Sequence, residues 1–222
     1  MHAILKSLVP LTTTQSGENI PLFLIGHSMG GAQVLYYALH PQSPYHTNIA
    51  TGTGEVQLAG VVSIAPFIGL HPSVQASPLF LYLGRIMAKL APNTQLVQNV
   101  DLQGLTRNQA SLDDVLKHPE LAHQTLTFAG AAGMLERARW LDNIQAQLIA
   151  QNDVPPLWIG HGTADRITYF GATKKFTETV NAKDKTFKVY EGGYHKLTAE
   201  PDGMGEEVTG DIVGWMQHLF SR

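Results

Sequence analysis

The sequence predicts an α/β protein in which a mainly parallel sheet is covered by helices on both faces and interrupted by a helical insertion. Three observations lead to this prediction: short apolar segments suited to buried strands, helical segments that alternate with them, and one long stretch that holds helical patterns only. With 222 residues, the chain is long enough for one domain with such an insertion.

Four apolar segments are predicted to form the strands, at residues 20–25, 56–67, 155–165 and 185–195. Helices are predicted in the first ten residues and at residues 30–40, 169–180 and 204–220, with Pro41 ending the second of them. The insertion covers residues 70–152, where we expect helices at 79–90 and 131–150 and no strand. The predicted core therefore consists of residues 1–69 and 153–222.

The composition excludes several classes of protein. A net charge of −3 gives no general attraction for nucleic acid. The absence of cysteine excludes disulfides, thiolate metal sites and a cysteine nucleophile. Neither a convincing signal peptide nor an apolar stretch of membrane-spanning length is present. We expect a cytoplasmic protein that is at most peripheral on membranes or lipid droplets.

Residues 26–30, Gly-His-Ser-Met-Gly, match the pattern G-x-S-x-G between a predicted strand and a predicted helix. Gly26 and Gly30 would permit a sharp turn that lifts the Ser28 hydroxyl above the sheet. The backbone N–H of Met29, at the start of the helix, would then help to stabilise an oxyanion. The alternative is a glycine-rich turn in which the serine only caps the helix.

A serine hydroxyl needs a base to become a good nucleophile. Asp165 follows the third predicted strand and His195 follows the fourth, so the chain order is Ser28, Asp165, His195. We predict that Asp165 orients His195 and that His195 acts as general base and then general acid. Three other aspartates fit less well because they precede the third strand or follow the histidine: Asp153, Asp202 and Asp211.

The remaining histidines have less specific interpretations. His27 lies inside the turn and is expected to pack or to line a pocket, and His161 is expected to be a packed histidine bonded to backbone. Three histidines of the insertion are expected at the surface: His71, His118 and His123. No pair has convincing metal-ligand spacing, so we expect neither a metal nor a cofactor.

Three segments, "GHSMGGA", "HGTADRIT" and "VYEGGYHKLTAEPD", together resemble the monoacylglycerol lipase family of α/β-hydrolases, in its fungal form. "LAPN" at residues 90–93 and "LTRNQ" at residues 105–109 resemble landmarks of that family's cap. The resemblance implies hydrolysis of monoacylglycerols to glycerol and a fatty acid through an acyl-enzyme, with Ser28, Asp165 and His195 as the triad and no cofactor. It also implies that residues 70–152 form a cap or lid with an acyl tunnel.

The same resemblance implies four strands, a helix and an H-G-x-G loop ahead of residues 20–25. Only the first ten residues and a loop precede that strand here, so we expect an N-terminally truncated α/β-hydrolase core. The strand at 20–25 should then be an exposed edge with unpaired backbone groups. Losing the loop's oxyanion N–H typically costs about 10²–10³ in rate.

Other functions stay open at this point. The chain could be a catalytically inactive, lipid-binding remnant. It could also be a lysophospholipase or carboxylesterase with the same triad, because the acyl pocket and head-group contacts decide the substrate. The helix at 79–90, which carries Arg85 and Lys89 among apolar residues, would either rest on a lipid surface or pack on the core.

Overall fold

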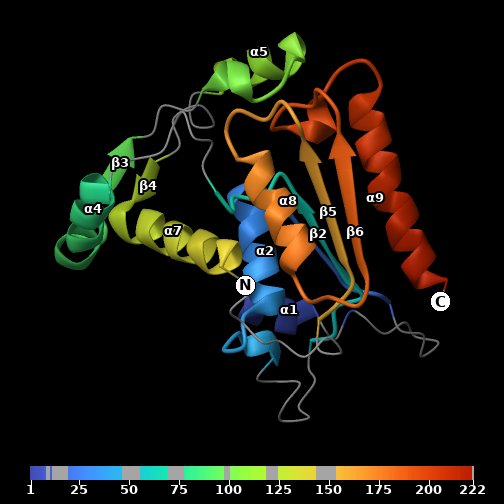
Figure 1. Ribbon diagram of the computed structural model, residues 1–222, viewed down its shortest axis with the longest axis horizontal. Helices are drawn as coiled ribbons and strands as arrows, with labels where there is room; N and C mark the ends of the chain where they lie inside the picture. The colour runs from blue at the N-terminus through green and yellow to red at the C-terminus, as the bar shows by residue number, and fades with distance from the viewer. Residues whose placement is uncertain are drawn as a thin grey trace.

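The computed structural model describes residues 1–8, 11, 20–46, 56–69, 78–97, 101–118, 125–143 and 154–221 (Figure 1). Its centre is a four-stranded sheet in the order β1-β2-β5-β6, and every neighbouring pair is parallel. The strands are β1 (Phe23–His27), β2 (Gly60–Ile64), β5 (Leu157–Gly162) and β6 (Lys185–Tyr190). The predicted parallel sheet is confirmed. All four strands are shorter than the apolar segments that predict them, and β1 also begins three residues later and ends two residues later than predicted.

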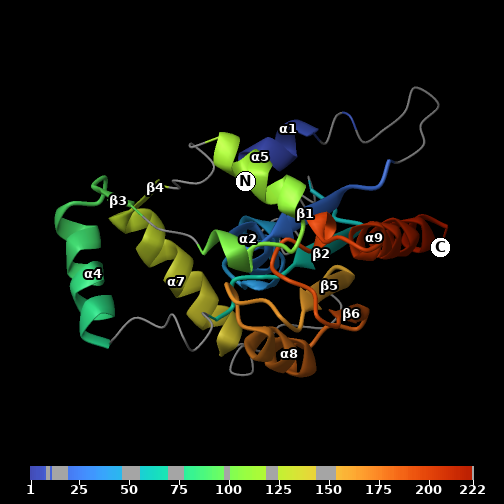
Figure 2. The same cartoon turned by 90° about the horizontal axis from the view of Figure 1, so that it is seen from above.

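Helices cover both faces of this sheet (Figure 2). On one face lie α2 (Met29–Leu39) and α8 (Phe170–Thr179), and on the other lies α9 (Met204–Phe220). Successive residues of a strand point to opposite faces of the sheet. Since helices cover both faces, the side chains on both must be apolar. Val61, Leu157 and Ile159 join the α2 and α8 side, whereas Val62 and Trp158 join the α9 side.

Strand β1 is an edge of the described sheet, because it pairs with β2 alone. Ile25 on this strand is 52% exposed. This confirms the expectation of an exposed edge at the strand before Ser28. The short helix α1 (His2–Leu8) buries Leu5 in the same cluster as α2, and His2 Nδ1 lies 2.8 Å from the Tyr37 hydroxyl.

The insertion contains three helices and two strands among its described residues. They are α4 (Pro78–Leu90), β3 (Gln95–Val97), α5 (Gln109–Lys117), β4 (Thr125–Thr127) and α7 (Phe128–Asp142), with a 3-10 turn at Leu102–Gly104. The expectation of no strand is wrong, because β3 and β4 form an antiparallel pair too short to show a periodicity. The predicted helix at 131–150 starts earlier, at Phe128, and residues 144–150 lie outside the described part.

Helix α5 lies above the carboxyl-terminal end of the sheet, whereas α4 lies far to the side (Figure 1). Helix α7 packs against α2 and α8, and the Lys175 ammonium reaches the Asp142 carboxylate at 2.9 Å. The described part of the insertion thus contacts the core through α7, and the Arg166 guanidinium of the core reaches the Asp101 carboxylate at 2.8 Å. None of the described helices is long and apolar enough to cross a membrane.

Candidate active site

Ser28 stands between β1 and α2 with an unusual backbone conformation, φ 56° and ψ −120°. Such values are rare for a residue with a side chain and cost roughly 1–3 kcal/mol. Two backbone hydrogen bonds hold it there: Ser28 N–H donates to Ile64 O at 2.9 Å, and Phe67 N–H donates to Ser28 O at 2.9 Å. Strain of this kind gathers at functional sites.

Two glycines allow α2 to approach the sheet at this turn. A Cβ on Gly26 would overlap the carbonyl oxygen of Gly30, and a Cβ on Gly31 would lie 2.9 Å from the Ser63 hydroxyl oxygen. By contrast, a Cβ on Gly30 would meet nothing within 4 Å. The turn therefore requires Gly26, which the motif predicts, and Gly31, which we did not single out from the sequence. For Gly30 the described residues show no steric need.

The two motif glycines should respond differently to alanine. Gly26→Ala is expected to lower the free energy of unfolding by about 1–3 kcal/mol or more, the cost of overpacking at a site that cannot yield. Gly30→Ala should raise it by about 0.5–1 kcal/mol, because alanine is the better helix former. Urea denaturation followed by tryptophan fluorescence measures both. Equal effects of the two substitutions would contradict this steric account.

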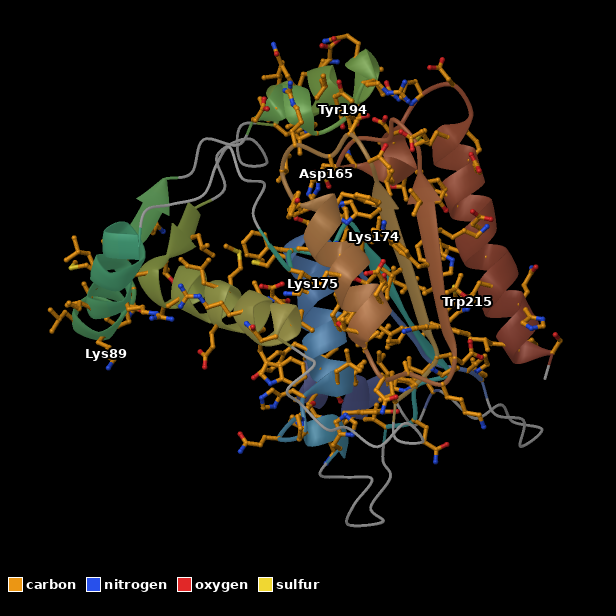
Figure 3. All side chains as sticks on the ribbon, in the orientation of Figure 1. Lys89, Asp165, Lys174, Lys175, Tyr194 and Trp215 are labelled. Carbon is orange, nitrogen blue, oxygen red and sulfur yellow. The ribbon has the colours of Figure 1, made fainter. Side chains whose placement is uncertain are left out.

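Asp165 and His195 come together at the carboxyl ends of β5 and β6, where Figure 3 labels Asp165. His195 Nδ1 lies 2.8 Å from Asp165 Oδ2, and the two residues are only 3% and 4% exposed. Asp165 Oδ1 accepts the backbone N–H groups of Ile167 and Thr168 at 2.8 and 2.9 Å. The carboxylate is therefore fixed in orientation by its own loop, and its other oxygen faces the imidazole.

Oδ2 of Asp165 has two further partners. The Thr168 hydroxyl lies 2.7 Å away and His161 Nε2 lies 3.1 Å away. Burial alone would raise the pKa of the Asp165 carboxyl, but hydrogen bonds from His161 and His195 hold it well below its usual range. An ionised Asp165 can stabilise the imidazolium that forms when His195 takes up a proton. Thr168 stands three residues after the aspartate and shows no distinct sequence signal.

The prediction that His161 bonds to backbone is wrong. Its buried ring meets side chains instead: Nδ1 lies 2.9 Å from the Thr173 hydroxyl, and Nε2 lies at the Asp165 carboxylate and 3.4 Å from the Thr168 hydroxyl. Strand β5 ends directly after His161, and the following turn brings Asp165 back onto the ring. The sequence shows that His161 and Asp165 are four residues apart, but their contact depends on the turn between them, which the spacing alone does not predict.

His27 packs against His195, with ring centroids 4.6 Å apart, although part of the ring stays exposed. Its Nε2–H donates to the backbone carbonyl of His195 at 3.0 Å. Burial, together with the neighbouring His195, lowers the pKa of His27. Since His27 directly precedes Ser28, this contact joins the serine turn to the histidine loop.

The rival residues lie elsewhere or serve other contacts. Asp202 is exposed, and Asp211 accepts the hydroxyl of Tyr190 at 2.9 Å. His118 is exposed, as expected. The remaining rivals, Asp153, His71 and His123, lie outside the described residues.

Two polar groups at the serine turn, the Ser28 hydroxyl and the Met29 N–H, form no hydrogen bond within the described part of the chain. With Nδ1 of His195 bound to Asp165, Nε2 is the nitrogen left to serve a nucleophile. All these groups lie at the carboxyl ends of parallel strands, where such folds place their sites.

Comparison with known proteins extends this picture. Residues 5–202 match the family described as "Serine aminopeptidase, S33". A relative from Schizosaccharomyces pombe is 30% identical over 201 residues, which are 90% of this chain and 49% of the relative. Monoglyceride lipase of Rattus norvegicus is 27% identical over 210 residues, 95% of this chain and 63% of the lipase. The chain thus spans about half to two thirds of the length of these relatives.

Solved structures agree with the fold. A soluble variant of monoglyceride lipase from Saccharomyces cerevisiae, in complex with a substrate analogue, superposes with a TM-score of 0.78 at 25% identity. This match covers 98% of our chain and 67% of the yeast chain. Monoacylglycerol lipase of Paleococcus ferrophilus shares the fold, with a TM-score of 0.75 at 24% identity and coverage of 98% and 74%. The fold is therefore that of the α/β-hydrolases, and the chain belongs to the serine aminopeptidase S33 family.

Proposed function

We propose that this chain is a serine hydrolase that cleaves monoacylglycerols to glycerol and a fatty acid. The observation that carries the proposal is the strained Ser28 turn at the same end of the sheet as the buried Asp165–His195 pair. The names of the relatives, several of them monoglyceride lipases, support the substrate class. Ester hydrolysis by such a constellation needs no cofactor.

In the proposed first half-reaction, the Ser28 hydroxyl oxygen attacks the ester carbonyl while Nε2 of His195 takes its proton. A bond forms between Ser28 and the acyl carbon, and the carbonyl electrons move onto its oxygen. The backbone N–H of Met29, at the start of α2, donates to this oxyanion. The C–O bond to glycerol then breaks, and His195 returns the proton to the glycerol oxygen.

Water completes the cycle in the second half-reaction. His195 takes a proton from water, the hydroxide attacks the acyl-Ser28 ester, and the proton passes to the Ser28 oxygen as the fatty acid leaves. Asp165 stays ionised throughout, because its hydrogen bonds hold its pKa well below the usual range. Its roles are to fix the Nδ1–H tautomer of His195 and to stabilise the imidazolium.

Head-group selectivity tests the substrate assignment. The purified chain is assayed with an oleoyl monoacylglycerol, an oleoyl lysophosphatidylcholine and the acetate ester of glycerol. The first two differ only in the head group, and the third removes the long acyl chain. We expect kcat/KM to be at least about tenfold higher for the monoacylglycerol than for either other ester, an ordinary margin for pocket selectivity.

Two other outcomes would favour the other functions. Equal or faster cleavage of the lysophospholipid or the acetate would indicate a lysophospholipase or carboxylesterase with the same triad. Tight binding of a fluorescent fatty acid without turnover of any ester would indicate a lipid-binding protein that lacks catalysis.

We also propose that residues 70–152 act as a cap that meets the lipid surface through α4. This helix exposes several large apolar side chains beside Arg85 and Lys89: Leu83, Ile86, Met87 and Leu90, the last 76% exposed. Apolar residues flanked by basic ones suit a helix lying at an anionic lipid interface. Sedimentation with anionic vesicles, compared with a Leu83→Ser/Leu90→Ser variant, tests this contact.

A further inference from the structure

Glu200 is a buried carboxylate that neither the sequence motifs nor the proposed reaction uses. It follows the 3-10 turn Leu197–Ala199, five residues after His195. Its side chain has no exposed surface. A charge buried this deeply is costly unless its lone pairs are fully engaged. The identity of its partners therefore shows what the carboxylate holds together.

Its four hydrogen bonds come from two distant segments. Oε1 accepts the Thr106 hydroxyl at 2.7 Å and the Arg107 N–H at 2.9 Å. Oε2 accepts the Arg107 Nε–H at 2.8 Å and the backbone N–H of Tyr194 at 3.2 Å. Thr106 and Arg107 belong to the insertion, between Leu102–Gly104 and α5, and Tyr194 directly precedes His195. One carboxylate thus joins the insertion to the histidine loop.

Further bonds run beside this joint. The N–H of Lys196 donates to Leu105 O at 2.6 Å, and the Lys196 ammonium donates to the Ser111 hydroxyl at 3.1 Å. His27 also donates to the carbonyl of His195. The backbone of each of the three residues Tyr194, His195 and Lys196 is therefore held by a hydrogen bond to a residue outside this run. Figure 3 shows Tyr194 directly beneath α5, where this contact lies.

We propose that Glu200 is a positioning residue for His195: by tying residues 105–107 of the insertion to the peptide before His195, it holds the imidazole in register with Ser28 and Asp165. The inference rests on the proposed function, since only a hydrolase gives His195 a reaction to be aligned for. It assigns the LTRNQ segment a task that its place in the insertion does not reveal. It also makes the geometry of His195 depend on contact with the insertion.

The chemistry of the joint requires a carboxylate. All four partners act as donors, and a carboxylate offers acceptor oxygens only. Burial alone would raise the pKa of Glu200, but hydrogen bonds from Arg107 and Thr106 keep it below its ordinary value, so the group is ionised at neutral pH. A glutamine of the same shape would replace one carboxylate oxygen by an NH₂ group, which is itself a donor. In one orientation the NH₂ group faces Arg107 Nε–H and Tyr194 N–H. In the other it faces the Thr106 hydroxyl and the Arg107 backbone N–H. The joint should then open without loss of side-chain volume.

The test compares Glu200→Gln with Asp202→Asn. Asp202 is 84% exposed and approaches Arg107 only at 4.0 Å, so this control removes a charge near the same arginine and leaves the joint intact. Turnover of a monoacylglycerol is measured per active site, counted with a fluorophosphonate. Glu200→Gln should lower kcat about 10- to 100-fold with KM changed less than about twofold, the signature of a misplaced catalytic group. Asp202→Asn should behave as the unmodified chain.

A second readout is independent of activity. The proton between His195 Nδ1 and Asp165 is expected to give a downfield NMR resonance, which should shift or broaden in Glu200→Gln and stay in place in Asp202→Asn. Wild-type kcat per site together with an unchanged resonance would overturn the proposal, even if the melting temperature fell. If the unmodified chain hydrolyses no ester, the proposed function fails. The resonance alone then decides whether Glu200 positions His195. Should Glu200→Gln not fold, the isosteric Thr106→Val carries the same two readouts.

Discussion

Ser28→Ala is expected to lower the kcat for ester hydrolysis by between about 10⁴- and 10⁶-fold, the range found when a triad nucleophile is removed. The effect is this large because the other groups act on the serine oxygen. Without it, His195 has no hydroxyl to deprotonate and no acyl-enzyme forms. Steady-state hydrolysis of a monoacylglycerol, with free fatty acid measured over hours for the variant, quantifies the loss.

Ser7→Ala is the matched control. It removes an exposed hydroxyl on helix α1 whose one hydrogen bond among the described residues goes to the Ile4 carbonyl. It should leave kcat within about twofold of the unmodified chain, as surface substitutions usually do. A Ser28→Ala variant that keeps a tenth or more of the activity would mean that another residue is the nucleophile.

Asp165→Asn is expected to lower kcat about 10⁴-fold. The amide can present its NH₂ group to His195, which favours the imidazole tautomer whose Nε2 carries the proton and cannot act as base. Steady-state turnover at neutral pH measures the loss. Asp202→Asn, which makes the same chemical change at an exposed position, should leave turnover unchanged. Near-normal turnover in Asp165→Asn would show that His195 is oriented by another group.

The same substitution should change how stability depends on pH. The folded-state pKa of Asp165 is depressed, so its stabilising contribution is complete above its unfolded-state pKa of about 3.9 and is lost as the pH falls below that value. The unfolding midpoint in urea should therefore fall less steeply below pH 4 in Asp165→Asn than in the unmodified chain. Some dependence should remain, because Glu200 also has a depressed pKa.

Much of the core could be predicted because its signals are local. Buried parallel strands are apolar on both faces, and α9 at Met204–Phe220 falls where its pattern predicts. The pair β3–β4 escaped prediction because three-residue strands show no periodicity. Strand ends also escaped, because apolar character continues into residues such as Phe67, which is buried in a loop.

Only those site residues could be predicted that a motif or the order of residues along the chain singles out. The pattern around Ser28, and one aspartate and one histidine after later strands, were enough to single out residues that the fold brings to one end of the sheet. Thr168, His161 and Glu200 could not be found in this way. Their partners are side chains and backbone groups whose proximity depends on turns and on the insertion, which leave no periodic pattern in the sequence.

The central claim is that Ser28, His195 and Asp165 act together as a triad in this polypeptide. Incubating the native 222-residue chain with a fluorophosphonate and measuring its intact mass tests this most directly. We predict one adduct per chain, located on Ser28 by peptide mapping and absent after denaturation or in Ser28→Ala. A soluble, folded chain that acquires no adduct, or one that is labelled at another residue, would contradict the account.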